Sequence, residues 1–440
     1  MLFFIIVFFV SSDVFSQSGF RFYGSNTDKQ QINFKLINNL IIIPLEINGK
    51  RMSFILDTGL SKTILFHVNK KDSLDLKNIE KVTLQGLGSG KPIDALVSKH
   101  NRFKIKNLIS NDEDLHIVLN DKLDLSSKMG ITIHGIIGYN LFRSAIVKVN
   151  YKTKRITFYN PKTFSYKKCK KCETFPLQFY RKKPYISMKV QLDTVFNKNT
   201  HVKMLVDTGG SDAIWLFEHT KKEIVTPKRF FKDVLGEGLN GTIYGNRSRI
   251  PAIFLGRFTI KKPTVSFLDS ISTFNARKIE GRNGSIGSSV LKRFKVWIDY
   301  PNRKMTLKKN GSFSSDFNYN MSGLEIVYNG KVLVQERGVT SVDSYGTKGE
   351  KNNTISFVTN YYYKFKPSYR INRVTKGSSA DLVGLLKGDI LVRLNGKQAH
   401  TYELSRIVSL CQEREGKKIR LIVDRNGEKL HFEFRLKKKI

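Results

Sequence analysis

The sequence predicts an all-β protein in which two repeated lobes precede a smaller, different β-rich domain. Apolar residues alternate along most segments with the period of two that strands require, and β-branched and aromatic residues dominate these segments. A set of motifs occurs twice at nearly one spacing, and the pattern changes beyond Gly311. The 440 residues also exceed what one hydrophobic core usually supports. We therefore expect domains at residues 30–165, 173–312 and 320–440.

The N-terminal segment has the pattern of a cleaved export signal. Its apolar run from Leu2 to Val10 is too short to cross a bilayer of about 30 Å. Val14-Phe15-Ser16 has the small-residue character of a signal-peptidase site, although no lysine or arginine precedes the apolar run. We expect residues 1–16 to be a signal peptide. The mature protein should then be soluble, and either secreted or located in the periplasm or cell envelope.

The first repeat starts at Asn38 and ends in an Asp-Thr-Gly motif. Its alternating residues predict two strands, a turn at Asn48-Gly49, and a third strand that ends at residues 57–59. The same plan starts at Lys183 and ends in Asp-Thr-Gly at residues 207–209, 150 positions later. This repetition predicts that the two lobes share one fold.

Each copy continues with a glycine-containing hairpin candidate and a second shared motif. The hairpin candidates begin at Gly86 and Gly236. The shared motif reads IIGYNLF in the first copy and SIGSSVL in the second. Its glycine follows the aspartate by 81 residues at Gly138 and by 80 residues at Gly287. Two motifs in the same order at one spacing indicate an internal duplication.

Two aspartates on equivalent turns can act together on a peptide bond. They must lie within about 3 Å, because one shared proton lets one carboxylate activate a water while the other protonates the carbonyl. A duplication brings Asp57 and Asp207 together by pseudo-twofold symmetry, which makes them the candidate catalytic residues. Threonine hydroxyls can hydrogen-bond to the partner loop, and glycines let the backbones approach. The candidates for this support are Thr58, Gly59, Thr208 and Gly209.

Over roughly residues 35–310 these motifs resemble the pepsin/retropepsin family of aspartic peptidases. The likeness rests on both Asp-Thr-Gly motifs, the apolar strand before each, and the apolar-apolar-Gly element after each. It implies a two-lobed pair of acid-protease barrels and an aspartic endopeptidase that needs no metal or other cofactor. It also implies that residues 136–138 pack behind the loop of Asp57. Ile286-Gly287 would do the same for Asp207, with Ser285 in place of one apolar residue.

The resemblance also implies a flap, a glycine-rich hairpin that covers the cleft. The two hairpin candidates could each supply it, and an aromatic side chain in the second copy could face the cleft. The flap candidates are Gly88, Gly238 and Tyr244.

Two positions near the aspartates predict the working pH. Leu60 and Gly210 stand where the family often has a serine or threonine hydroxyl that donates to a carboxylate. Without these donors the ionised form is less stabilised, so we expect raised carboxylate pKa values and activity nearer neutral pH than that of pepsin.

The C-terminal segment resembles a PDZ domain through GSSA at residues 377–380, GLLKGD at 384–389 and LNG at 394–396. The combination with the peptidase motifs resembles a bacterial envelope type. Such a domain accepts a peptide as an added strand between a carboxylate-binding loop and a helix. A polar stretch of about 40 residues separates that loop from the GSSA motif. The candidates for binding a peptide C-terminus are Gly323, Leu324, Leu404 and Val408.

The chain is strongly basic, with 76 Lys+Arg against 37 Asp+Glu and a net charge of +39. Lysines occur in every segment, and the longest basic runs, 167–171 and 437–439, lack the interleaved aromatic residues of a single-strand nucleic-acid groove. We therefore expect no nucleic-acid partner. The expected partners are a polypeptide substrate, a peptide C-terminus at the PDZ domain and, loosely, an anionic membrane surface.

The three cysteines exclude a disulfide scaffold. Cys169 and Cys172 form a C-x-x-C pair that could close a small loop or remain reduced. No second ligand pair completes a zinc site, so we expect no metal. Cys411 fits a small core residue in an amphipathic stretch.

Three other interpretations of the sequence compete with a single-chain aspartic endopeptidase, and the first of them stays open. The chain could be a non-catalytic envelope protein that binds peptides through its PDZ domain. Dimerisation of single lobes is unnecessary when both lobes occur in one chain. A serine nucleophile at Ser285 is disfavoured, because Asn283 stands where a nucleophile elbow has glycine.

Overall fold

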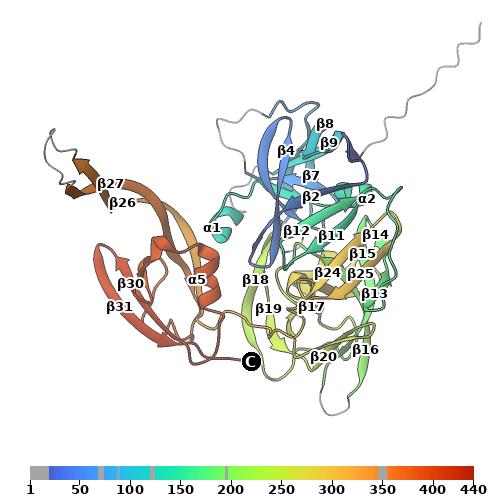
Figure 1. Ribbon diagram of the computed structural model, residues 1–440. Coiled ribbons are helices and arrows are strands. Elements are labelled where there is room, and N and C mark those ends of the chain that lie inside the picture. The colour runs from blue at the N-terminus through green and yellow to red at the C-terminus, as the bar shows by residue number, and fades with distance from the viewer. Residues whose placement is uncertain are drawn as a thin grey trace, which may run out of the picture.

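The computed structural model describes residues 19–67, 74–86, 88, 90–118, 124–193, 197–344 and 354–440. Two β-rich lobes lie against each other, and a third β-rich unit stands beside them (Figure 1). The expected signal peptide lies outside the described residues. Among the residues that are described, no helix is long and apolar enough to cross a membrane.

The sheet of the first lobe has the strand order β1-β9-β6-β10-β5-β4-β8-β7, with β3 beside β4. Asn48 and Gly49 adopt positive φ angles of 47° and 84°, so they form the tight turn between β4 and β5. Between Asn38 and this turn the structure has one strand, β4, where the sequence predicted two. The elements are β1 (Arg21–Phe22), β3 (Lys35–Ile37), β4 (Leu40–Ile47), β5 (Lys50–Leu56), β6 (Thr63–Leu65), β7 (Glu80–Leu84), β8 (Ile93–Ile105), β9 (Leu108–Val118), α1 (Leu125–Met129), β10 (Gly135–Ile137) and α2 (Tyr139–Ser144).

The second lobe repeats the centre of the first. Its strands β17-β23-β16-β15 correspond to β6-β10-β5-β4, and each set contains one parallel pair, β16 with β23 and β5 with β10. The elements are β14 (Gln178–Tyr180), β15 (Lys183–Gln191), β16 (Asn199–Asp207), β17 (Ile214–Phe217), β18 (Phe231–Gly238), β19 (Gly241–Arg249), β20 (Ala252–Leu255), β21 (Phe258–Lys261), β22 (Thr264–Leu268), α3 (Ser270–Arg277), β23 (Arg282–Gly287) and α4 (Ser288–Leu291).

A shared sheet joins the two lobes, with the order β13-β25-β24-β11-β12-β2. At its centre β11 of the first lobe pairs antiparallel with β24 of the second, and one apolar core extends through both lobes. A disulfide joins Cys169 to Cys172 at the start of β13. The strands are β2 (Lys29–Asn33), β11 (Ile146–Asn150), β12 (Arg155–Tyr159), β13 (Cys172–Pro176), β24 (Phe294–Asp299) and β25 (Lys304–Lys309).

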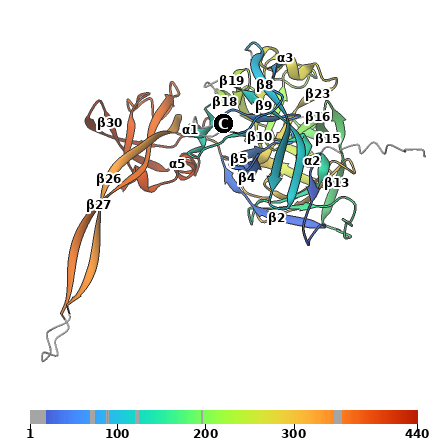
Figure 2. The same cartoon turned by 90° about the horizontal axis from the view of Figure 1, so that it is seen from above.

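The C-terminal domain has its own sheet, in the order β26-β27-β28-β30-β31, and its own apolar core. The polar stretch expected between the loop and the GSSA motif forms the outer part of β26 and β27, a long hairpin that extends away from the domain (Figure 2). The elements are β26 (Leu324–Ser344), β27 (Thr354–Val374), β28 (Ile390–Leu394), β29 (Lys397–Gln398), a 3₁₀ turn (Ala399–Thr401), α5 (Leu404–Leu410), β30 (Lys418–Arg425) and β31 (Glu428–Arg435).

Candidate active site

Asp57 and Asp207 stand at equivalent ends of central strands. Asp57 directly follows β5, and its backbone N–H donates to the carbonyl of Ile137 at 2.9 Å. Asp207 ends β16 and pairs in register with Gly287 of β23. Each aspartate is therefore fixed by a parallel strand from the second motif of its own lobe.

The glycines of the second motif allow this motif to pack behind the aspartate loops. A Cβ atom built on Gly138 would lie 2.3 Å from the carbonyl oxygen of Leu60. One built on Gly287 would lie 2.3 Å from the carbonyl oxygen of Asp212. No side chain fits at such distances, so both lobes need glycine here.

The two threonines lock the loops to each other. The backbone N–H of Thr58 donates to the Thr208 hydroxyl at 3.0 Å, and that of Thr208 donates to the Thr58 hydroxyl at 3.0 Å. The hydroxyls in turn donate across the lobes, Thr58 to the Val206 carbonyl at 2.7 Å and Thr208 to the Leu56 carbonyl at 2.8 Å. Both side chains are buried, so these four bonds hold the aspartates in a symmetric arrangement.

The carboxylates of both aspartates approach the same glycine. A Cβ atom on Gly59 would lie 3.1 Å from Asp57 Oδ1 and 3.3 Å from Asp207 Oδ1. One on Gly209 would lie 2.3 Å from the carboxyl carbon of Asp57. The Gly59 N–H donates to Asp57 Oδ1 at 2.6 Å. The structure thus brings the two candidate catalytic residues and their supporting residues together.

Burial and the nearby charge of Asp207 raise the pKa of Asp57 to about 7, against the hydrogen bond from Gly59 and the charge of Lys183. Burial also raises the pKa of Asp207, while Arg282 and Lys183 act to lower it. The pair, which we call the dyad, can therefore hold one proton near neutral pH. One carboxylic acid beside one carboxylate can donate and accept protons in the same reaction.

Sequence reasoning missed Lys183 and Arg282 as parts of the site. Lys183 begins β15 and Arg282 begins β23, and burial lowers the pKa of both side chains. No local pattern separates them from the chain's other lysines and arginines. Only the parallel pairing of β16 with β23 and the hairpin of β15 with β16 bring them to the dyad.

A third missed residue, Tyr300, supports the first loop from the second lobe. Its hydroxyl donates to the backbone carbonyl of Thr58 at 3.1 Å, and its side chain is buried. Burial raises the pKa of Tyr300 well above its usual value, so the hydroxyl stays protonated as a donor. The tyrosine directly follows β24, whose pairing with β11 across the lobes cannot be read from either repeat alone.

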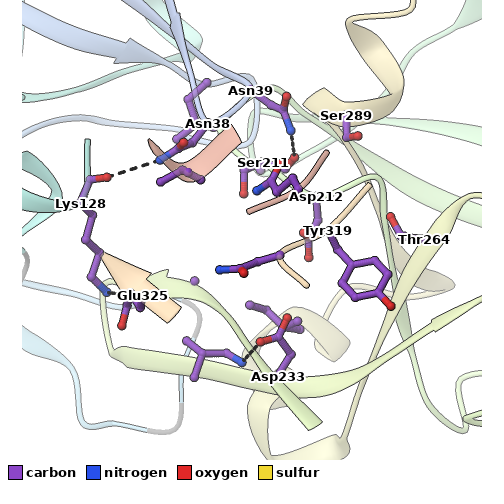
Figure 3. Close-up of a pocket in the computed structure, with 18 of the residues that line it drawn as sticks. Asn38, Asn39, Lys128, Ser211, Asp212, Asp233, Thr264, Ser289, Tyr319 and Glu325 are labelled. Atoms are coloured by element: carbon purple, nitrogen blue, oxygen red, sulfur yellow. Dashed lines mark hydrogen bonds and ion pairs between the residues drawn. The ribbon is translucent and has the colours of Figure 1, made fainter. Parts of the chain in front are cut away.

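A cavity of about 680 Å³ opens beside the dyad (Figure 3). Its lining includes Asp57, Gly209 and several residues of the β18–β19 hairpin. Ile243 of β19 lines the cavity, whereas Tyr244 has a side chain that is 60% exposed. Neighbouring residues on a strand point to opposite faces, so Ile243, and not Tyr244, faces the cavity.

The two flap candidates meet at their tips. The backbone carbonyl of Asn240 accepts a hydrogen bond from the Gly90 N–H at 2.9 Å, and its side chain binds the Gly86 N–H and the Lys91 carbonyl. Gly88 has a φ of 115°, and a Cβ atom there would lie 2.7 Å from the Asn240 carbonyl carbon. Asn240 follows β18 in the turn after Gly238, so the second hairpin is fastened to the first.

A buried arginine holds the base of the β18–β19 hairpin. Arg247 binds Asp233 of β18 at 2.7 Å and Asp212 at 3.0 Å. Asp212 lies five residues after Asp207 and also accepts a hydrogen bond from Trp215 at 2.8 Å. This network ties the hairpin to the loop that carries the second aspartate.

Three of the four peptide-binding candidates of the C-terminal domain line the same cavity. Gly323, Leu324 and Val408 line it, and Leu404 is buried at the start of α5. Ser285, the candidate for a serine nucleophile, lies within β23. Its side chain is 5% exposed, and its backbone pairs with Leu205 on one side and Trp215 on the other.

Comparison with known proteins agrees with this architecture. The aspartyl protease family model matches residues 43–141 and 192–290, and a PDZ domain model matches residues 370–425. No curated protein sequence matches the chain. The crystal structure of an aspartic proteinase from Irpex lacteus aligns with 65% of this chain and 98% of its own, at 11% identity and a TM-score of 0.43. The chain thus contains two repeats that match the aspartyl protease family, followed by a PDZ domain.

Proposed function

We propose that this protein is an aspartic endopeptidase whose catalytic residues are Asp57 and Asp207. The observation that supports this most is the convergence of both carboxylates on Gly59. With a pKa of about 7 for Asp57, the dyad can still hold a proton near neutral pH.

The proposed reaction uses a water held between the carboxylates. The ionised carboxylate takes a proton from the water, whose oxygen attacks the peptide carbonyl carbon, and the protonated carboxyl gives its proton to the carbonyl oxygen. The tetrahedral intermediate then collapses: the carboxyl that took the proton from the water gives it to the amine nitrogen, the C–N bond breaks, and a hydroxyl group of the intermediate returns a proton to the other carboxylate. The dyad again holds one proton. Because Arg282 favours the ionised form of Asp207, Asp57 is the acid in the first step.

The expected substrate is a polypeptide in an extended conformation. The cavity is lined by Asp57, by residues of both lobes and by the β18–β19 hairpin, so an extended chain in it would contact both lobes. The PDZ domain lines the same cavity, which supports a role in recruiting or regulating.

Proteolysis of a peptide library by the purified protein tests this proposal. The protein should cleave peptides, and Asp57→Asn and Asp207→Asn should each abolish cleavage because the reaction needs both carboxylates. Binding of peptides without cleavage would instead favour a non-catalytic protein. A single variant that keeps more than about a tenth of the activity would remove the dyad from the mechanism.

A further inference from the structure

Helix α1 of the first lobe lies at the peptide groove of the PDZ domain, where it contacts β26, and the residue that ends it contacts α5. On one side Lys128 Nζ lies 3.5 Å from Glu325 Oε1 of β26. On the other, a Cβ atom built on Gly130 would lie 2.7 Å from the Cβ of Leu404, the first residue of α5. A peptide added to β26 would have to run between these two elements, so α1 stands where such a peptide would lie.

Gly130 makes this approach possible. It ends α1 in the left-handed conformation, with a φ of 70°, and its N–H donates to the Ser126 carbonyl at 2.9 Å. Glycine adopts this conformation without strain and has no side chain to collide with Leu404. One residue thus ends the helix and seats it against α5.

The carboxylate-binding loop, which directly precedes Glu325, is bound internally. The N–H of Ser322 donates to Asn320 Oδ1 at 3.0 Å, and that of Leu324 donates to the Ser322 hydroxyl at 3.1 Å. The N–H of Met321 donates to the Cys411 carbonyl at 2.9 Å. PDZ domains hold a peptide carboxylate with loop N–H groups of this kind. Here all three N–H groups already donate hydrogen bonds to acceptors within the domain itself.

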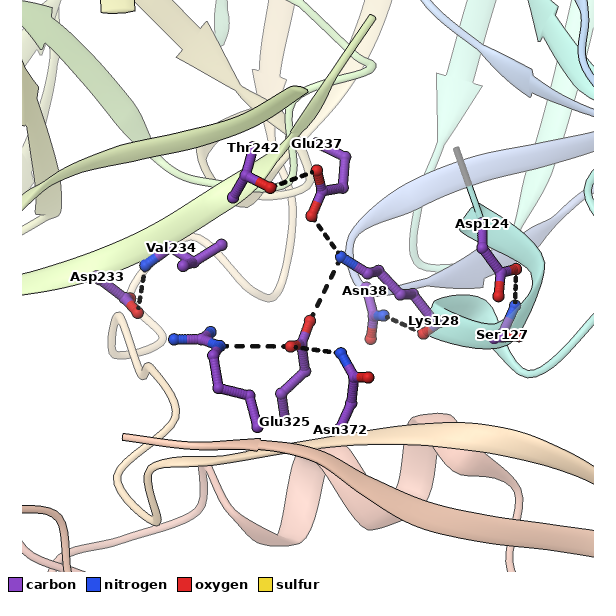
Figure 4. A network of polar contacts seen from close by, with 11 residues as sticks. Asn38, Asp124, Ser127, Lys128, Asp233, Val234, Glu237, Thr242, Glu325 and Asn372 are labelled. Atoms are coloured by element: carbon purple, nitrogen blue, oxygen red, sulfur yellow. Dashed lines mark hydrogen bonds and ion pairs between the residues drawn. The ribbon is translucent and has the colours of Figure 1, made fainter. Parts of the chain in front are cut away.

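Lys128 also contacts the hairpin beside the catalytic cleft. Its Nζ lies 2.7 Å from Glu237 Oε1 at the end of β18, and the second oxygen of Glu237 accepts a hydrogen bond from Thr242 of β19 at 2.9 Å. Glu325 is held in turn by Asn372 at 3.0 Å and Arg373 at 3.4 Å. Figure 4 shows this chain of contacts from the hairpin through α1 to the PDZ domain.

We propose that α1 is the resident ligand of the PDZ groove and that Lys128 joins this docked helix to the β18–β19 hairpin. The PDZ domain then helps to hold the hairpin beside the dyad. Lys128 lines the cavity as well, and it acts as a positioning residue because its two ion pairs hold the hairpin and the PDZ domain beside the dyad. A polypeptide that enters the groove must displace α1 and break the Lys128–Glu325 pair. The positioning role of Lys128 in catalysis rests on the proposed peptidase activity. The docking of α1 in the PDZ groove does not depend on that activity.

Hydrogen exchange of the full chain, measured by mass spectrometry, tests the docking without any substrate. Lys128→Glu places like charges against both glutamates. It should speed exchange about three- to fivefold at residues 324–328 and in the β18–β19 hairpin. Lys99→Glu is the matched control, because it breaks an ion pair of 2.6 Å with Glu80 elsewhere in the first lobe. It should change neither segment.

Charge-swapped double variants separate the two contacts. Lys128→Glu with Glu325→Lys should restore slow exchange at residues 324–328 only. Lys128→Glu with Glu237→Lys should restore it in the hairpin only. The proposal is overturned if Lys128→Glu leaves either segment unchanged, if Lys99→Glu gives the same effect, or if neither double variant restores its own segment.

A kinetic measurement adds the link to catalysis. With an extended peptide substrate, Lys128→Glu should raise KM about threefold with a smaller change in kcat, and Glu237→Lys should reverse the rise. If exchange behaves as expected but no variant or wild-type protein cleaves peptides, the proposed function fails while the docking stands. If hydrogen exchange in the β18–β19 hairpin becomes faster in Lys128→Glu but KM stays unchanged, Lys128 has no positioning role.

Discussion

Lys183 acts on both carboxylates of the dyad, and its positive charge lowers the pKa of each. In a Lys183→Met variant the protonated form of the dyad should persist to higher pH. The basic limb of the pH profile of kcat/KM, which falls as the last proton leaves, should therefore move upward by roughly one pH unit.

Lys189→Met provides the matched control for this prediction, because Lys189 is an exposed lysine on the same strand. Its profile should coincide with that of the wild-type protein. A basic limb that stays in place in Lys183→Met, or moves equally in Lys189→Met, would show that Lys183 does not act on the dyad.

The sequence predicted that the pKa values of the two catalytic carboxylates are raised, but not the main cause of this rise. The absence of hydroxyl groups at Leu60 and Gly210 predicted raised carboxylate pKa values. In the structure, burial is the largest cause for both aspartates, and Lys183 and Arg282 oppose it. The two aspartates are buried because the two lobes meet around them. This burial cannot be predicted from the residues next to each aspartate in the sequence.

The fastening of the two hairpins is a property of elements that are far apart in the chain. Asn240→Ala removes the side-chain hydrogen bonds to Gly86 and Lys91. The tip of the β18–β19 hairpin should then open more often, so KM for an extended peptide should rise about three- to tenfold. Enzyme kinetics on one defined peptide measures this change.

Asn246→Ala is the control, since Asn246 lies in the same hairpin but binds Thr226 near its base. It should change KM less than Asn240→Ala does. Equal effects of the two substitutions would mean that the hairpin responds to any lost hydrogen bond rather than to release of its tip.

The sequence predicted elements with local signals better than those that depend on distant partners. The Asn48-Gly49 turn and the strand before Asp57 follow from local chemistry. The prediction of a polar stretch was wrong for the outer β26–β27 hairpin. Its strands carry exposed apolar side chains such as Leu333, Val339 and Phe365, which face no core. Asn240 carried no signal, because its partners lie about 150 positions away.

At the scale of the molecule, the PDZ domain has a core that is separate from that of the two lobes. The fragment of residues 318–440 should therefore fold alone. Tyr319 belongs to this core, and its hydroxyl accepts hydrogen bonds from the N–H groups of Lys439 and Ile440. An amide spectrum of the fragment should be well dispersed.

A fragment that starts at residue 323 lacks Tyr319 and Met321 and should melt at a lower temperature. Collapsed spectra from both fragments would show that the domain needs the lobes in order to fold.

The duplication allowed the sequence to predict the two-lobed body and the pairing of Asp57 with Asp207. It could not predict that the PDZ domain faces the same cavity, because α1, Lys128 and Glu325 come from segments with no shared pattern. The order of domains along a chain does not determine their packing, which depends on side-chain contacts between them.

The most direct test of a catalytic dyad compares four proteins: wild type, Asp57→Asn, Asp207→Asn and the double variant. Two carboxylates that share one proton form a single catalytic unit, so kcat/KM on one peptide should be equally low in all three variants. A double variant whose loss equals the product of two partial single losses would show that the aspartates act independently and would contradict the proposed mechanism.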